Sequence, residues 1–398
     1  MQTISDIGIV GGGPVGQLLA VALARQDFDI VLIDRRQAAP VSESGRSFAL
    51  SVASCRLLKA LGFGDVLERH GQPITGVVVS EASQPGGPGS NTLSFDPGEI
   101  GELTFGCLLS EHHLQNAVSQ RLAETEQVTI RHGLTAVASR IETGGRFVSS
   151  SDGSDLRTAM LAVCDGQSGF LNDLGITCFS KDYHQSAVVC TVTHTHDHDG
   201  LMRQIFLPTG PLALLPLPEN QTAIVLTTEP DRAAALVRHH PDGFIATLQP
   251  MVDDALGTIA SVRHRAQWPL SLSIANSLAG PRLALLGDAA RRIHPLAGQG
   301  LNLGLRDVAT LEDILVQARR RGEDFGMITE RYQKLRRADG VAYSVATDMF
   351  NTIYSTTSPS LGALRTLGVS ILANLSPARR RLLREAAGLA GECPQLMR

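Results

Sequence analysis

The chain has 398 residues, of which 43% are hydrophobic and 4% aromatic, so it is long enough for two or three domains with a mainly aliphatic core. Its net charge of −4 and its pI near 6.3 argue against a nucleic-acid-binding protein. Its six cysteines form no Cys-x-x-Cys pair, which argues against zinc and dithiol sites and predicts free thiols in a reducing cytoplasm.

The first predicted feature is a glycine-rich turn between a strand and a helix. Ile7 to Val10 has the pattern of a buried parallel strand. Gly11 to Gly16 then fits G-x-G-x-x-G, and Pro14 suits the first turn of a helix that extends to about Gln26. The pattern glycines allow a tight turn and close approach of the backbone to a phosphate, so they are candidate binding residues: Gly11, Gly13 and Gly16.

A second strand, Ile30 to Ile33, is predicted to complete a βαβ unit. Asp34 ends it, roughly twenty residues after the first glycine, where an acid can reach the adenosine ribose. This acid favours a free ribose 2′-hydroxyl over a 2′-phosphate, although Arg35 and Arg36 weaken the argument.

The stretch from Ile7 to Ala24 is apolar enough to resemble a targeting or membrane segment. However, no Lys or Arg precedes it and glycines interrupt it, so we interpret it as part of the nucleotide-binding unit. No other run is long and apolar enough to span a bilayer. We therefore expect a cytoplasmic protein.

The middle of the chain is predicted to be mostly strands. Thr75 to Val79 and Thr92 to Phe95 predict a hairpin that starts a second sheet, and 231–248 predicts a helix. Trp268 suits either core packing or a wall of the substrate cavity, and we favour core packing. Further strands are predicted over residues 128–131, 159–164, 187–192, 203–207, 212–216 and 223–228, and a further helix over 111–122.

Three histidines alternate along one short segment: His194, His196 and His198. Alternate residues of a strand share one face, so a metal site is one interpretation. No second element supplies a ligand at a fixed spacing, and we therefore favour a polar hairpin loop over a metal site.

A second candidate binding region lies between Arg282 and Leu315. A short strand, Leu283 to Leu286, ends at an acidic turn, and a helix is predicted from about Leu301. A carboxylate suits the hydroxyls of a polyol, glycines let a flat ring lie close to the backbone, and a helix N-terminus suits an anion. FAD combines a ribityl chain, a flat ring and a diphosphate. The candidate residues are Gly287, Asp288, Pro295, Gly298, Gln299, Gly300, Leu301 and Asn302.

The string GDAARRIHPLAGQGLNLGLRD resembles the second FAD-binding motif of the group A aromatic hydroxylases, and is most similar to the ubiquinone-biosynthesis hydroxylase family. Arg291 departs from the family pattern, which usually has His there. Asp165 and Gly166 match the middle motif of the family, but Gly169 and Asn172 stand where the family has Ser and Arg. That partial motif puts the reaction with the reductant in doubt.

The resemblance implies an α/β fold, in which a Rossmann-like FAD-binding domain of the aromatic-hydroxylase type is interleaved with a β-sheet substrate domain and followed by C-terminal helices. We expect the FAD-binding domain in residues 1–72, 106–178 and 276–340. The substrate domain is expected in residues 73–105 and 179–275, and the C-terminal helical region in residues 341–398.

The resemblance also implies residue roles. Arg46 stands in a segment similar to the R-x-x-A-L-S segment of the family, whose Arg lies near the flavin; a solvated surface Arg is the alternative. We take Arg46, His294 and Pro295 as the catalytic candidates, with a purely structural role equally open for His294. The other expected FAD contacts are Arg35, Asp165 and Gly166, together with the glycines, Asp34 and the second-motif residues named above.

The function implied is that of an FAD-dependent monooxygenase, which takes a hydride from NADPH or NADH, reacts with O₂ and hydroxylates the ring of a polyprenylated phenol in ubiquinone biosynthesis. FAD carries the difficult chemistry, so no metal, triad or carboxylate pair is needed. The alternatives are a hydroxylase of a soluble aromatic compound and a flavin-binding assembly subunit with little turnover.

Helices are predicted after Leu315, over residues 324–351, 361–374 and 378–387. A basic cluster lies there: Arg365, Arg379, Arg380, Arg381 and Arg384. A solvated helix face is the default interpretation. Because the substrates of the family carry a polyprenyl tail, peripheral contact with the inner face of a membrane, or with a biosynthetic complex, is the sharper hypothesis.

Overall fold

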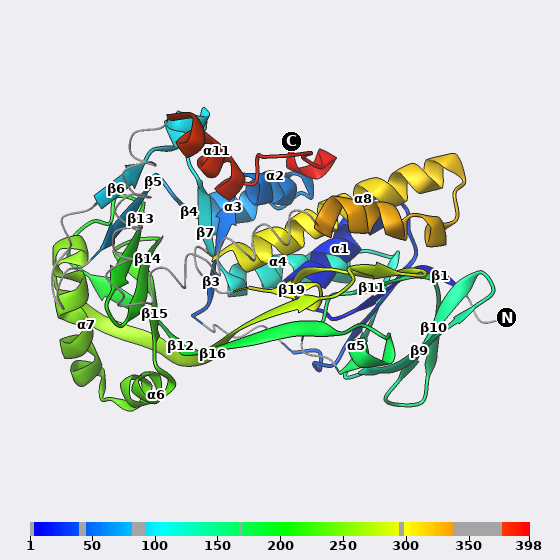
Figure 1. The fold of residues 1–398 in the computed structure, drawn as a ribbon, viewed down its shortest axis with the longest axis horizontal. Helices are drawn as coiled ribbons and strands as arrows, with labels where there is room; N and C mark the ends of the chain where they lie inside the picture. Colours follow the sequence, from blue (N-terminus) through cyan, green and yellow to red (C-terminus); the bar gives the residue numbers. More distant parts are fainter. Residues whose placement is uncertain (1–3, 40–44, 82–91, 167–168, 294–297, 338–375) are drawn as a thin grey trace.

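The computed structural model describes residues 4–39, 45–81, 92–166, 169–293, 298–337 and 376–398. Two large sheets lie at opposite ends of an elongated molecule, and helices cover the region between them (Figure 1). Within the described ranges, no helix is long and apolar enough to cross a bilayer.

The first sheet has the strand order β17-β18-β11-β1-β2-β8, and its centre is parallel. The sequence predicted its core, because the buried strands are short apolar runs followed by glycine or acid. Helices α1 (Pro14–Ala24), α4 (Glu111–Ala123) and α8 (Gln299–Arg321) pack beside one another on it. The strands are β1 (Ser5–Val10), β2 (Ile30–Asp34), β8 (Val128–His132), β11 (Asp155–Val163), β17 (Ala279–Gly280) and β18 (Leu283–Leu285).

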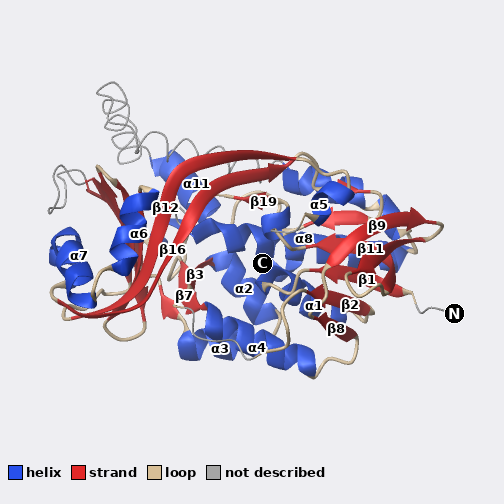
Figure 2. Cartoon of the chain, turned by 90° about the horizontal axis from the view of Figure 1, so that it is seen from below, coloured by secondary structure: helices blue, strands red, loops and turns tan. Residues whose placement is uncertain are grey.

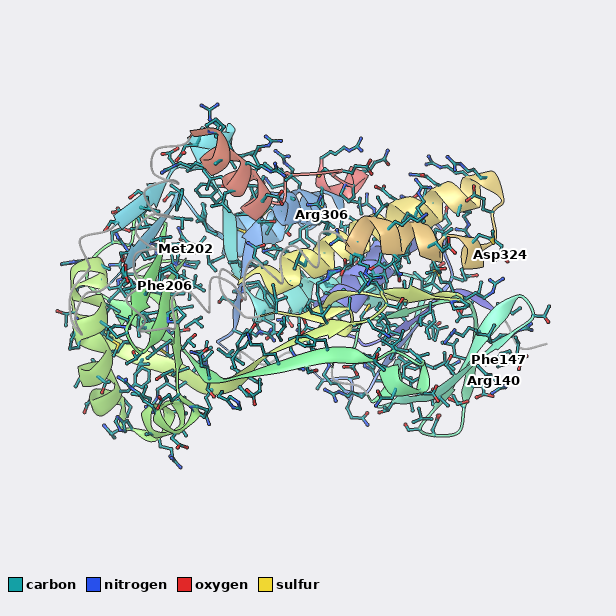
Figure 3. All side chains as sticks on the ribbon, in the orientation of Figure 1. Arg140, Phe147, Met202, Phe206, Arg306 and Asp324 are labelled. Carbon is teal, nitrogen blue, oxygen red and sulfur yellow. The ribbon has the colours of Figure 1, made fainter. Side chains whose placement is uncertain are left out.

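A hairpin of β9 (Ala136–Glu142) and β10 (Gly145–Ser150) extends this sheet antiparallel beyond β11. This hairpin was not predicted from the sequence. On the hairpin Arg140 lies over the ring of Phe147, 4.6 Å from the ring centroid (Figure 3). Helix α5 (Phe170–Asp173) follows β11.

The second sheet has the order β19-β16-β12-β15-β14-β13-β5-β6. The hairpin predicted from Thr75 onward is confirmed, since β5 and β6 pair antiparallel. β12 and β16 are each 17 residues long, and they arch from this sheet to the side of the first one (Figure 2). The strands are β5 (Gly76–Glu81), β6 (Thr92–Phe95), β12 (Cys178–His194), β13 (Leu201–Leu207), β14 (Gly210–Leu217), β15 (Gln221–Thr228), β16 (Ile259–Ala275) and β19 (Arg291–Arg292).

Two predictions for this sheet were wrong. The single helix expected over 231–248 is two helices, α6 (Pro230–Arg238) and α7 (Pro241–Leu256), because Pro241 cannot continue the preceding helix and starts the next one. Trp268 does not pack in the core, since it is 59% exposed on β16. The side chain of a residue on a long strand faces solvent or protein according to its register, which the sequence did not reveal.

A third, small sheet joins the two large ones. Its strands are β3 (Ser47–Ser51), β4 (Gln72–Pro73) and β7 (Gly106–Ser110), with helices α2 (Val52–Ala60) and α3 (Gly64–His70) beside it. Helix α11 (Ser376–Ala386) lies near α2 and β7 (Figure 1). Leu383 of α11 packs in an apolar cluster with Ile74 and Leu108 of this region.

The predicted C-terminal helices are described only in part. Residues 325–327 form a 3-10 turn, and the helix that follows is seen over 329–337, so it begins later than Asp324. The Asp324 side chain accepts a hydrogen bond from the Gly326 backbone N–H and so caps the 3-10 turn. The helix predicted over 361–374 lies outside the described residues. The proposed domain boundaries remain predictions.

Candidate functional site

In the turn from Gly11 to Gly16, protein atoms crowd every glycine except Gly13, so a ligand can approach only there. A Cβ on Gly16 would lie 2.0 Å from the Gly11 carbonyl oxygen, and one on Gly11, at φ +107°, would lie 2.7 Å from the Asp165 nitrogen. By contrast, Gly13 faces open space and precedes α1 without a side-chain cap. The first N–H groups of α1 are therefore free to bind an anion.

Asp34 lies at the end of β2 with its carboxylate against this turn. A Cβ on Gly12 would lie 2.3 Å from Asp34 Oδ2, so the middle glycine is required too, which the pattern did not reveal. Arg36 donates to Asp34 from its backbone N (3.1 Å) and from Nη2 (2.9 Å), and Nη2 also donates to the Gly12 carbonyl. Arg36 thus orients the acid rather than competing with it.

A small, open hollow lies beside the turn. Arg35 and Asp165 line it together with Gly11, Ile33 and Leu134. In a βαβ unit of this kind the adenosine end of a dinucleotide binds beyond the carboxyl ends of the strands. The hollow therefore brings the predicted contacts Arg35 and Asp165 next to the expected nucleoside position.

The middle and second motifs interlock at the ends of β11 and β18. A Cβ on Gly166 would lie only 2.4 Å from Asp288 Cβ, and Gly287 has a φ of +57°, which favours glycine. Asp288 is solvent-exposed, and the space in front of it, where the flavin ring is expected, is called the cleft below. Desolvation by nearby protein groups raises the pKa of the Asp288 carboxyl, and the charges of Arg46 and Arg292 oppose this shift.

A buried ionic cluster holds the Gly287-Asp288 turn from behind. Asp307 of α8 accepts a hydrogen bond from the Gly287 N–H at 3.0 Å. Its carboxylate also pairs with Arg291 Nη2 at 2.8 Å and Arg336 Nε at 2.7 Å, and none of the three side chains is more than 2% exposed. Arg291 therefore has a structural role. Sequence reasoning missed Asp307 and Arg336, because nothing in their spacing marks a buried pair.

Among the described residues, the N-terminus of α8 also lacks a side-chain cap. Gly298 precedes it in the left-handed conformation at φ +63°, without a side-chain cap, and a Cβ on Gly300 would meet nothing. The first N–H groups of α8 can therefore bind a polar ring edge or an anion. Leu301 packs against the main core, and Gln299 reaches the Ala386 carbonyl at 3.5 Å.

Asn302 fastens α8 to the small sheet. It donates to the Ala49 carbonyl at 2.8 Å and accepts from the Ser51 N–H at 2.9 Å and the Ser54 hydroxyl at 2.7 Å. Its amide is thus engaged with protein groups, and a direct cofactor contact stays a prediction. His294 and Pro295 lie outside the described residues, and their catalytic roles also stay predictions.

Arg46 lies within electrostatic range of Asp288. Its side chain is 61% exposed, and its Nη1 lies 3.8 Å from the Glu111 carboxylate. Its guanidinium carbon lies 5.3 Å from the centroid of the Phe48 ring. Because its charge also acts on Asp288, it is close enough to meet a ligand there. Of the middle-motif departures, Gly169 precedes α5 and Asn172 is exposed.

The three alternating histidines form a hydrogen-bonded turn. His194 bonds the His196 carbonyl at 2.8 Å and the Thr222 hydroxyl at 2.9 Å, while His198 bonds the Leu217 carbonyl at 2.7 Å. In the described residues, no group of three or more His, Cys, Asp or Glu could hold a metal.

Comparison with known proteins identifies the family. A family model described as "FAD binding domain" matches residues 5–343. The chain belongs to this FAD-binding family. It is 34% identical to the ubiquinone hydroxylase UbiL of Rhodospirillum rubrum, covering 99% of this chain and 93% of that protein. It is 32% identical to the 3-demethoxyubiquinol 3-hydroxylase of Escherichia coli, and the match covers 97% of this chain and 99% of that protein.

Solved structures show the same fold at low identity. The p-nitrophenol 4-monooxygenase PnpA of Pseudomonas putida matches with a TM-score of 0.81 and 20% identity, covering 98% of this chain and 100% of that one. HpxO of Klebsiella pneumoniae, solved with FAD, matches with a TM-score of 0.76 and 16% identity, and the match covers 96% of this chain and 99% of that one. The α/β fold expected from the sequence, an FAD-binding unit interleaved with a β-sheet, is therefore confirmed.

The described residues of this family member fit FAD. Gly13 and the free end of α1 suit its diphosphate, and Asp34 suits its adenosine ribose. The exposed carboxylate of Asp288 suits ribityl hydroxyls, and the free end of α8 suits the polar edge of the flavin ring. When bound, FAD supplies hydride acceptance and reaction with O₂, neither of which amino-acid side chains provide.

Proposed function

We propose that this FAD-dependent monooxygenase hydroxylates the aromatic ring of a polyprenylated phenol in ubiquinone biosynthesis, with O₂ as oxidant and NADPH or NADH as electron donor. The similarity to a ubiquinone hydroxylase along almost the entire length of both chains carries this proposal. The altered residue Arg291 is explained by its ion pair with Asp307, so it gives no support to an assembly subunit with little turnover.

Each part of the cleft has a role in this reaction. The ends of α1 and α8 bind and orient the cofactor, while Asp34 and Asp288 accept hydrogen bonds from its hydroxyls. The second sheet encloses the far side. Met202 and Phe206 lie on β13 of that sheet (Figure 3), and the face carrying Met202 packs against aliphatic and aromatic residues around Phe105. Such surroundings exclude water from the oxygen transfer.

Helix α11 supports the further proposal of peripheral membrane contact. Arg380, Arg381 and Arg384 are exposed on it, and so is Leu382. Arg379 differs, because it donates to Glu99 from Nε at 2.6 Å and from Nη2 at 2.7 Å and thereby fixes the helix to the protein. Three exposed arginines beside an exposed leucine suit an anionic lipid surface. Arg365 of the same predicted cluster lies outside the described residues.

The test of the proposed function is anaerobic reduction of the purified holoenzyme by NADPH and by NADH, with and without a prenylphenol analogue, followed by O₂. Faster flavin reduction with the phenol, and a product heavier by one oxygen, are expected. Flavin that neither nucleotide reduces would overturn the proposal and favour the assembly subunit. Hydroxylation of a soluble phenol in preference to the prenylated one would restrict the proposal to its reaction class.

A further inference from the structure

Arg292 carries a guanidinium without a direct protein partner among the described residues. Its Nε is buried, yet in the described part of the chain no hydrogen bond or ion pair engages this guanidinium. The preceding residue, Arg291, is by contrast fully paired with Asp307. Arg292 as a whole is only partly buried, so its guanidinium stays accessible, while the buried Nε–H lacks an acceptor. A buried donor normally has a hydrogen-bond partner, so this group points to an anionic ligand.

The direction of Arg292 follows from the strand. Neighbouring residues of a strand point to opposite faces, and the Arg291 side chain lies against Asp307, so Arg292 points away from α8. On its own face Arg292 pairs with Ser273 of β16, which in turn pairs with Ser180 of β12. Adjacent strands are about 4.8 Å apart, so one cation and two hydroxyls form a row roughly 10 Å long.

This row lies near the expected flavin position. The charges of Arg292 and Arg46 both act on the Asp288 carboxyl, so both guanidiniums lie within electrostatic range of the second motif. Ser273 is half-buried and Ser180 is exposed, which leaves both hydroxyls accessible to a ligand. A planar guanidinium flanked by hydroxyl donors is the chemistry that binds phosphate groups.

We propose that Arg292, with Ser273 and Ser180, binds the diphosphate of a dinucleotide at the edge of the cleft. FAD already has the open end of α1 for its own diphosphate, so the reductant, NADPH or NADH, is the favoured source. The inference rests on the proposed reduction by such a nucleotide. It also explains how a chain with a partial middle motif can still bind its electron donor.

The test uses Arg292→Gln, Arg292→Lys, Ser273→Ala and the control Arg263→Gln, each purified with FAD. Arg263 lies exposed on β16, the strand of Ser273, and donates to Gln221, so its replacement removes an equal charge away from the row. Each holoenzyme is titrated with NADP⁺ and NAD⁺, which bind without turnover, at low and high salt. Each apoprotein is titrated with FAD.

Arg292→Gln is expected to weaken NADP⁺ or NAD⁺ binding about tenfold, with a smaller loss in Arg292→Lys and Ser273→Ala and none in the control. FAD affinity and melting temperature should not change. A loss confined to FAD would support the diphosphate site and assign it to the cofactor instead. Unchanged binding of all nucleotides, or a general loss with a lower melting temperature, would overturn the proposal.

The two proposals fail separately. If the wild type binds NADP⁺ through Arg292 but yields no hydroxylated phenol, the proposed substrate is wrong and the nucleotide site stands. If the wild type hydroxylates the phenol and Arg292→Gln binds nucleotide normally, only the nucleotide site is wrong.

Discussion

Asp307 binds Arg291 at 2.8 Å and the Gly287 N–H at 3.0 Å, and thereby joins α8 to the turn that presents Asp288 to the cleft. Both side chains of the ion pair are buried, so neither can exchange its partner for water. A buried pair adds little to stability as a whole, but removing one member leaves the other charge uncompensated. The pair therefore fixes the geometry of the turn.

Replacing Asp307 with Asn should reduce both stability and FAD affinity. Two buried arginines would lose their shared carboxylate, at a cost of about 3–5 kcal/mol. Thermal unfolding and the flavin content of the purified protein measure the two effects. Glu323→Gln is the control, because Glu323 pairs with Arg321 at 3.4 Å on the surface and should cost about 1 kcal/mol or less. An Asp307→Asn protein that is purified with a full complement of FAD and has a normal melting temperature would contradict this account.

Gly16→Ala should abolish FAD binding. Its Cβ would lie 2.0 Å from the Gly11 carbonyl oxygen, so α1 would have to move away from the turn. Gly64→Ala is a matched control in α3, since its Cβ would meet only the Lys59 side chain, at 3.8 Å. Equilibrium FAD titration of the refolded apoproteins measures the effect, and equal affinity in both variants would refute the proposed turn geometry.

Glu312→Gln should stabilise the protein at pH 8 and change little at pH 5. Burial raises the pKa of Glu312 to about 7 from 4.5, and Asp313 adds to the shift. The folded protein thus favours the neutral acid, so the contribution of Glu312 to stability is complete below pH 4.5 and is lost as pH rises through 7. Gln stays neutral and still accepts from Gln26.

The expected gain above pH 7 is on the order of 3 kcal/mol, because the pKa rises from 4.5 to about 7 and one pKa unit corresponds to about 1.4 kcal/mol. Urea unfolding of both proteins at the two pH values measures it. The reverse order, with the larger gain at pH 5, would show that Glu312 is charged in the folded protein.

Reversing the exposed charges of α11, Arg380→Glu, Arg381→Glu and Arg384→Glu together, should reduce sedimentation with anionic liposomes without lowering the melting temperature. The control reverses three exposed arginines elsewhere: Arg69, Arg232 and Arg238. Two of these lie on α6, far from α11 (Figure 1). Liposome binding that is equal in both variants would remove the membrane proposal.

The sequence predicted the strands and turns at both ends of the FAD cleft, because each is a short apolar run followed by Gly or Asp with little conformational choice. It did not predict what holds them in place. The partners of Asp307 come from residues 287, 291 and 336, and only the fold makes them neighbours. The small sheet was missed because β4 has two residues, and Trp268 was placed wrongly because β16 is solvent-facing there.

The cleft is assembled from segments that are far apart in the chain. β1 pairs with β11, and β11 in turn pairs with β18. A Cβ on Gly304 of α8 would lie 2.7 Å from Val15, beside the first turn. A ribosome must therefore complete three quarters of the polypeptide before its first forty residues can acquire their cofactor. Until then the nascent N-terminal strand exposes an apolar surface, and the cell must protect it through most of translation.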